Sequence, residues 1–172
     1  MMISTRGRYA LRVMIDLAEA GGNAVIPLKE IASRQEISQK YLESIMVSLS
    51  KGGLVIGTHG KGGGYRLRSE PETYSLGDIL RLTEGSLAPV SCLEDGSAPC
   101  SRASICKTLP VWARLDKLIN DFFDGITLAD LVNGSISLPK DLTPRGKKLD
   151  LPKGSRLNGS STQSDHCHTD KA

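Results

Sequence analysis

The sequence LKEIASRQEISQKYLESIMVSLSKGGLVIGTHGKGGGYRLR, residues 28 to 68, decides the fold. A short periodic apolar segment, a break at residues 35–37 and a longer periodic segment follow one another, which is the helix-turn-helix arrangement. Ser38 is placed to cap the second helix, which we expect to run to about Lys51. Its buried stripe is expected to consist of Leu42, Ile45, Met46 and Leu49.

Two strand-like segments follow, residues 54–59 and 65–68, joined by the run GKGGG at residues 60–64. A β-hairpin directly after the second helix is a wing. The sequence therefore predicts a mainly α fold with a small β-wing, a winged helix-turn-helix DNA-binding domain with a long dimerisation helix. The rival is a nucleotide phosphate loop, which needs a helix and a Lys-Ser/Thr pair at the glycines, and neither is present.

The first part of the second helix would face bases and phosphates. Gln39 could bond adenine at two atoms, and Glu43 could accept a hydrogen bond from cytosine N4. The wing glycines allow close approach to DNA, and His59 and Lys61 could enter a minor groove. The alternative is a solvated face of a small helical domain. The candidate DNA-contacting residues are Arg6, Arg8, Leu28, Ser38, Gln39, Lys40, Tyr41, Glu43, Ser44, His59, Gly60, Lys61 and Gly62.

The formal net charge of +3 is mildly basic, which is compatible with nucleic-acid binding and does not establish it. We expect Arg6, Arg8 and Lys40 to contact phosphates. No stretch approaches the ~18 uninterrupted apolar residues of a membrane span, and the N-terminus lacks the apolar core of a signal peptide. We therefore expect a cytoplasmic protein, in which cysteines are more often ligands or redox sensors than disulfides.

An N-terminal helix is predicted for residues 5–20. Tyr9, Val13, Leu17 and Ala10, Met14, Ala18 recur at helical spacing, with Arg8, Arg12, Asp16 and Glu19 between them. Further along the chain, Ser75 and Thr127 are expected to cap two short helices.

The helix predicted for residues 110–124 carries apolar side chains around more than half of its circumference. One small core cannot cover so much, so we expect one face to pack on its own domain and another on a partner subunit. A wholly buried helix is the alternative.

The expected organisation is a regulator domain at 2–132 and a disordered tail at 133–172. Within the regulator domain we expect the helix-turn-helix at 28–51, the wing at 54–68, the cysteine loop at 92–106 and the dimerisation helix at 108–124.

Three of the four cysteines, Cys92, Cys100 and Cys106, lie in one small, polar, loop-like stretch. The spacing is not Cys-x-x-Cys, so a zinc knuckle is a poor match. Iron–sulfur clusters are bound through thiolates and tolerate wider loops. Three interpretations stay open: a metal or cluster site, a redox switch between two thiols, or inert cysteines.

Catalytic constellations are not found, since no Ser/His/Asp set, paired carboxylates or nucleophile elbow can be placed. We therefore do not expect an enzyme. The tail segment His166-Cys167-His168 could bind metal, but chance is the better interpretation of so short a tract.

Several motifs together resemble the IscR-like, or Rrf-two, family of bacterial winged-helix regulators, with its IscR, NsrR and CymR branches. The resemblance covers about residues 2–132. It rests on ISTRGRY at 3–9, IASRQEIS at 31–38, YLE at 41–43, GLV at 53–55, GKGGGY at 60–65, LGDI at 76–79 and ITLADL at 126–131.

The resemblance implies a homodimer built on a long antiparallel helix pair, and palindromic or pseudo-palindromic DNA sites. It implies that Cys92, Cys100 and Cys106 hold an iron–sulfur cluster, with 2Fe-2S preferred over 4Fe-4S. It also implies that Glu43 tunes the choice of operator, as the matching glutamate does in IscR-like members.

The chain departs from the family at the fourth cluster ligand. IscR-like members carry a ligand histidine where this chain has Leu109, and NsrR-like members use an aspartate of the partner's first helix where it has Arg8. The candidates are Glu94, Asp95, the Cys167 region, a water or a small thiol. His59 replaces the arginine of the IscR wing.

The predicted function is a DNA-binding regulator, a repressor, whose DNA affinity is controlled by the cluster. The segment PVSCLED at residues 89–95 also resembles CymR-like members, many of which hold no cluster. A cluster-free repressor controlled by a thiol switch or a protein partner is therefore the first alternative, and a small iron–sulfur or metal carrier is the second.

Overall fold

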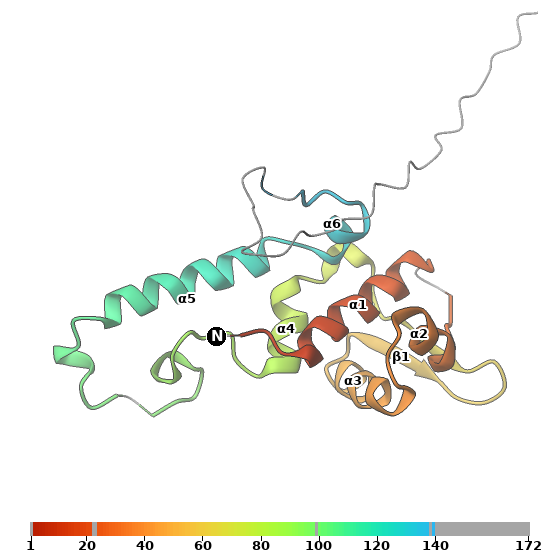
Figure 1. Cartoon of the computed structure of the whole chain (residues 1–172), viewed down its shortest axis with the longest axis horizontal. Helices are drawn as coiled ribbons and strands as arrows, with labels where there is room; N and C mark the ends of the chain where they lie inside the picture. The colour runs from red at the N-terminus through yellow and green to blue at the C-terminus, as the bar shows by residue number, and fades with distance from the viewer. Residues whose placement is uncertain (1, 22–23, 99, 138, 140–172) are drawn as a thin grey trace, which may run out of the picture. The chain divides into compact units, whose positions relative to one another are not determined.

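The computed structural model describes residues 2–21, 24–98, 100–137 and 139. The fold below is that of the compact unit formed by residues 1–137 (Figure 1). The predicted disordered tail, apart from its first residues, and the segment 166–168 lie outside the described residues. The elements are α1 Thr5–Glu19, α2 Leu28–Gln35, α3 Gln39–Lys51, β1 Val55–Thr58, β2 Gly64–Leu67, η1 Pro71–Thr73, α4 Leu76–Glu84, η2 Ser91–Leu93, η3 Ala103–Ile105, α5 Leu109–Asp124 and α6 Leu128–Val132.

The helix-turn-helix forms where it was predicted. Glu36 ends α2 in the left-handed region, at φ 55°, and the chain turns there toward α3. The Ser38 side chain then accepts a hydrogen bond from the amide of Tyr41, 3.3 Å away, which caps α3 as expected. The turn and the cap together set where α3 begins.

The wing is the antiparallel pair of β1 and β2, in register from Val55 opposite Leu67 to Thr58 opposite Gly64. Its base is held to the helical body by a bridge between Ile26 and Tyr65. Gly64 is buried there, and a Cβ at this position would lie 2.2 Å from the carbonyl oxygen of Ile26. Only glycine therefore allows this approach of the wing to the segment before α2.

The core lies between α1, the helix-turn-helix, the wing base, α4 and α6. The predicted stripe of α3 is fully buried in it, as are the inward positions of α1 and α4. Ser75 caps α4 and Thr127 caps α6, as the sequence predicted, and Thr127 also forms a capping box with Asp130. The largest fully buried side chains include Met14, Leu17, Ile31, Leu42, Ile45, Met46, Leu49, Leu67, Ile79, Leu80 and Leu128.

Asp16 lies where the helical pattern put it among polar positions, yet it is only 6% exposed. Both of its carboxylate oxygens accept hydrogen bonds from Arg34 of α2, at 2.9 and 2.7 Å, and Gln35 donates a third at 3.0 Å. Burial raises the pKa of Asp16, but these hydrogen bonds outweigh it, so the pKa of this carboxyl is lowered. The pair ties α1 to the helix-turn-helix.

Helix α5 packs on α4 along one side, and none of its residues is buried within the single chain. Val111 is 58% exposed, Leu118 66% and Phe122 61%. The wholly buried alternative is therefore not what this chain forms by itself. Among the described helices, none is both long enough and apolar enough to cross a membrane.

Candidate nucleic-acid interface and cysteine loop

The N-terminal part of α3 presents an exposed polar face made of Gln39, Lys40, Glu43 and Ser44, with Ser38 exposed at the cap. Gln39 Nε2 lies 3.4 Å from Glu43 Oε1, so the two side chains proposed for base contacts bond each other in the free chain. This face lies opposite the buried stripe of α3 and is therefore free to enter a groove of DNA.

Tyr41 and Leu28 differ from the other candidates because both are half-buried and pack against the core. The ring of Tyr41 meets Tyr9 edge to face, with ring centroids 6.0 Å apart. These two residues therefore shape the helix-turn-helix, and the polar positions around them carry the exposed surface.

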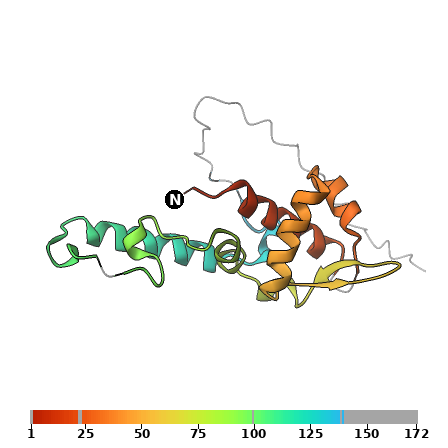
Figure 2. The same ribbon diagram turned by 90° about the horizontal axis from the view of Figure 1, so that it is seen from below.

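The wing places His59, Gly60, Lys61 and Gly62 together at its exposed tip. Gly60 and Gly62 have φ values of +95° and +80°, which residues other than glycine rarely adopt. Figure 2 shows the hairpin beside α3, so the exposed polar face of α3 and the wing tip lie on neighbouring elements.

Arg6 and Arg8 occupy different environments on α1. Arg8 is exposed, and among the described residues its guanidinium hydrogen-bonds only to Thr5 Oγ1, at 3.1 Å. The Nη2 of Arg6 instead donates to the carbonyl oxygen of Ser44 at 3.1 Å and to Ser48 Oγ at 2.5 Å. Arg6 is therefore directed at α3, whereas Arg8 faces solvent.

The cysteine loop consists of the two single turns η2 and η3 with irregular segments between them. Cys92 and Cys100 are exposed and Cys106 is half-buried, and all three are free thiols. The Sγ of Cys106 lies 3.4 Å from Thr108 Oγ1. The hydrogen bond with the Thr108 side chain, aided by backbone amides, lowers the pKa of the Cys106 thiol.

The loop suits an iron–sulfur cluster by the kind of donors it offers, which are three thiols, one of them with a lowered pKa. Within the described residues, however, no three His, Cys, Asp or Glu side chains are gathered closely enough to hold a metal ion. The donor set therefore fits a cluster chemically, and the loop would have to close around it.

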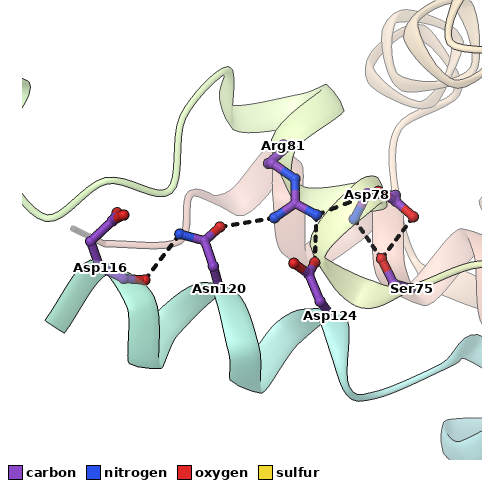
Figure 3. A network of polar contacts seen from close by, with 6 residues as sticks. All are labelled: Ser75, Asp78, Arg81, Asp116, Asn120 and Asp124. Atoms are coloured by element: carbon purple, nitrogen blue, oxygen red, sulfur yellow. Dashed lines mark hydrogen bonds and ion pairs between the residues drawn. The ribbon is translucent and has the colours of Figure 1, made fainter. Parts of the chain in front are cut away.

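A polar network joins α5 to α4, as Figure 3 shows. Arg81 donates to Asn120 Oδ1 at 2.9 Å and pairs with Asp124 and, at 3.4 Å, with Asp78. A Cβ on Gly77 would meet the Asp124 carboxylate and the Arg81 guanidinium, so a larger residue there would require the side-chain ends of this network to shift. The sequence reasoning missed this joint, because its partners are about 40 residues apart and no local pattern links them.

The comparisons with known proteins agree with this fold. The family model for Rrf2, described as an iron-dependent transcriptional regulator, matches residues 3–134. CymR of Bacillus subtilis is 40% identical over 133 residues, which cover 77% of this chain and 91% of CymR. Its solved structure, described as that of the global cysteine regulator, covers 78% of this chain and 98% of its own, with a TM-score of 0.63.

Two other relatives are informative. IscR of Vibrio vulnificus is 36% identical over 133 residues, covering 77% of this chain and 78% of IscR. A structure of the oxidised form of Staphylococcus aureus CymR is also 36% identical, covers 77% of this chain and 96% of its own, and has a TM-score of 0.59.

The fold, the exposed polar face of α3 and the adjoining wing define a winged helix-turn-helix regulator. The chain belongs to the Rrf2 family of transcriptional regulators, as its motifs predicted. Its relatives are regulators and not enzymes, in agreement with the expectation from the sequence.

Proposed function

We propose that this chain is a homodimeric repressor whose affinity for its DNA operator is controlled by an iron–sulfur cluster on Cys92, Cys100 and Cys106. The observation that carries the DNA-binding part is that the exposed polar face of α3 and the exposed wing tip belong to neighbouring elements. Such a pair can fill a major groove and the minor groove beside it.

Sequence discrimination is assigned to Gln39 and Glu43. In the free chain these two exposed side chains bond each other at 3.4 Å. On DNA each can turn to a base edge, Gln39 to adenine and Glu43 to the N4 amino group of cytosine. At a base edge that offers no hydrogen-bond donor, the Glu43 carboxylate would stay unpaired and be repelled by the nearby phosphates. Glu43 would therefore select against such sequences.

Selection of bound duplexes from a random pool, followed by competition binding, tests this assignment. Glu43→Ala is expected to relax the preference at one base position of each half-site by about 1–3 kcal/mol. Ser33→Ala, on the exposed surface of α2, is the control and should select the same sequence as the wild type. A wild-type chain that binds no duplex would contradict the proposal.

The dimer is assigned to the exposed apolar face of α5. Val111, Leu118 and Phe122 are each more than half exposed on one 16-residue helix, and Leu115 continues the face. A second copy that covers this face removes it from water, as expected for a two-fold pair. Leu118→Glu should give a monomer in sedimentation velocity, and Lys117→Gln, at the neighbouring exposed position, should not.

Control by a cluster is supported by the family description, which is iron-dependent, and by the three thiols of the loop. Bound there, a cluster would supply an iron centre that oxidants can remove. Thr108 would hold Cys106 in its thiolate form. Helix α5, which begins at Leu109, leads from the loop to the polar network that Arg81 of α4 forms with Asn120.

An anaerobic absorption spectrum with iron and sulfide analysis tests the cofactor. Visible charge-transfer bands are expected for the wild type and their loss for Cys106→Ala. Ser104→Ala, in the same loop, should keep the bands. A colourless wild-type protein after cluster reconstitution would contradict the cluster.

A thiol switch or a protein partner, without a cluster, is the second candidate. The observations that favour it are that Cys92 and Cys100 are exposed, that the described thiols are not gathered as a metal site, and that a relative has a described oxidised form. For a thiol switch, DNA affinity would change with diamide in colourless protein, and Cys→Ser variants would not respond. For control by a partner, DNA affinity would change only when the partner protein is added.

A further inference from the structure

A groove of about 460 Å³ lies between the C-terminal half of α3 and the wing. It lies C-terminal to the part of α3 that is proposed to read bases, and it extends along the wing to His59 at the tip. Both elements lie side by side in Figures 1 and 2. The side chains of interest in its lining are Val47, Ser50, Lys51, His59, Tyr65 and Arg68.

The groove is positively charged. Lys51 and Arg68 are exposed cations in its lining, His59 is exposed beside them, and none of the described lining residues is acidic. Neither Lys51 nor Arg68 belongs to an ion pair among the described residues, in contrast to Arg34 and Arg81. No described carboxylate neutralises these two cations, so their charges are available to an anion.

The groove continues the exposed face of α3. Lys40, Ser44, Val47 and Lys51 are spaced by four, three and four residues, which places them along one side of a helix. All four are exposed, and Val47 is 49% exposed although it is apolar. The face proposed for base contacts thus runs without interruption into the groove.

The geometry of duplex DNA determines what can occupy this place. A major groove and its neighbouring minor groove are separated by one sugar-phosphate strand. If α3 enters the first and the wing tip enters the second, that strand must pass between them. We propose that the groove holds this strand, with Lys51 and Arg68 on its phosphates and Val47 against its sugars. This inference rests on the proposed DNA-binding function and assigns contacts beyond it.

The test is the salt dependence of binding to a short fluorescent duplex of random sequence, measured by anisotropy with the full chain. Lys51→Gln and Arg68→Gln should each reduce the slope of log affinity against log salt by about 0.9 for every phosphate that the variant no longer neutralises. Each should weaken binding by roughly five- to tenfold per phosphate at about 0.1 M salt, equally for every sequence.

Matched variants separate the phosphate interaction from other effects. Lys51→Arg and Arg68→Lys keep the charge and should keep the slope. Lys117→Gln, on α5, should also keep it, and all variants should unfold at the wild-type urea concentration. An unchanged slope in Lys51→Gln and Arg68→Gln, with a wild type that binds, would overturn the groove assignment alone. A wild type that binds no duplex would overturn both proposals.

Discussion

The guanidinium of Arg6, in the first turn of α1, donates a hydrogen bond to the backbone carbonyl oxygen of Ser44 on α3, 3.1 Å away. The same nitrogen donates to Ser48 Oγ, one helical turn further on. The Nε of Arg6 is buried, and it has no partner among the described residues. In the free chain Arg6 therefore braces the helix proposed to read DNA.

Arg6→Gln should lower the free energy of unfolding by about 1–2 kcal/mol, because two hydrogen bonds from a charged group are removed. Arg8→Gln, two residues away and exposed, should change it by less than about 0.5 kcal/mol. Urea denaturation measures both. The effects on DNA binding should be the reverse. Arg8→Gln should reduce the slope of log affinity against log salt, and Arg6→Gln should leave that slope unchanged. The opposite pattern would make Arg6 a phosphate ligand.

Asp16→Asn should cost about 2 kcal/mol of stability at neutral pH, because the charged partner of Arg34 is removed from a buried position. The lowered pKa of Asp16 also predicts a pH effect. A carboxyl whose pKa is lower in the folded state stabilises the fold above its unfolded pKa of about 3.9, and this stability is lost as pH falls through the folded pKa.

Acid titrations of stability check this sign. The wild type should lose more stability than Asp16→Asn below about pH 4. Glu19→Gln, at an exposed position on the same helix, should follow the wild type closely. Equal acid losses in the wild type and Asp16→Asn would show that this carboxyl contributes nothing to the pH dependence.

Thr108→Val should shift the alkylation of Cys106 toward higher pH, because the hydroxyl that stabilises the thiolate is removed. Thr108→Ser keeps the hydroxyl and should keep the wild-type profile. Iodoacetamide labelling of cluster-free protein followed by peptide mass spectrometry measures this site separately from the other cysteines. Identical pH profiles for Thr108→Val and Thr108→Ser would remove the hydroxyl from the explanation.

Arg81→Gln should release α5 from α4, because the bonds to Asn120 and Asp124 are broken together. A loss of about 1–2 kcal/mol should speed amide hydrogen exchange in α5 by roughly tenfold, while α2 and α3 keep their protection. Lys117→Gln removes only an exposed pair with Asp121 and should leave exchange nearly unchanged. Faster exchange throughout the chain would indicate general destabilisation instead.

Local signals predicted much of the fold. Ser38, Ser75 and Thr127 each precede a periodic segment, and all three cap a helix in the structure. The wing followed from two strand-like segments around a run of glycines. β1 is one residue shorter at each end than predicted, and β2 begins and ends one residue earlier than predicted. These features depend on neighbours within a few residues, which is the range that sequence patterns cover.

Longer-range contacts could not be predicted in this way. Asp16 is buried because Arg34, 18 residues later, reaches both of its oxygens, and helical periodicity contains no such information. Lys51 differs, because it shares the helical spacing of Lys40 and Ser44 and so carries a local signal. Its place beside the wing, however, depends on how the hairpin packs on α3, which the spacing does not contain. The DNA-contact and cysteine assignments stay predictions.

The exposed apolar side of α5 has one more consequence. A helix without a single buried residue in its own chain gains little from folding alone, so a second copy would supply much of what keeps it in place. The ordering of α5 and the association of two copies would then be coupled, and the midpoint of thermal unfolding of α5 would rise with protein concentration. A regulator built in this way would lose its ordered α5, and with it the pairing of its two DNA-binding domains, as its own abundance in the cell declines.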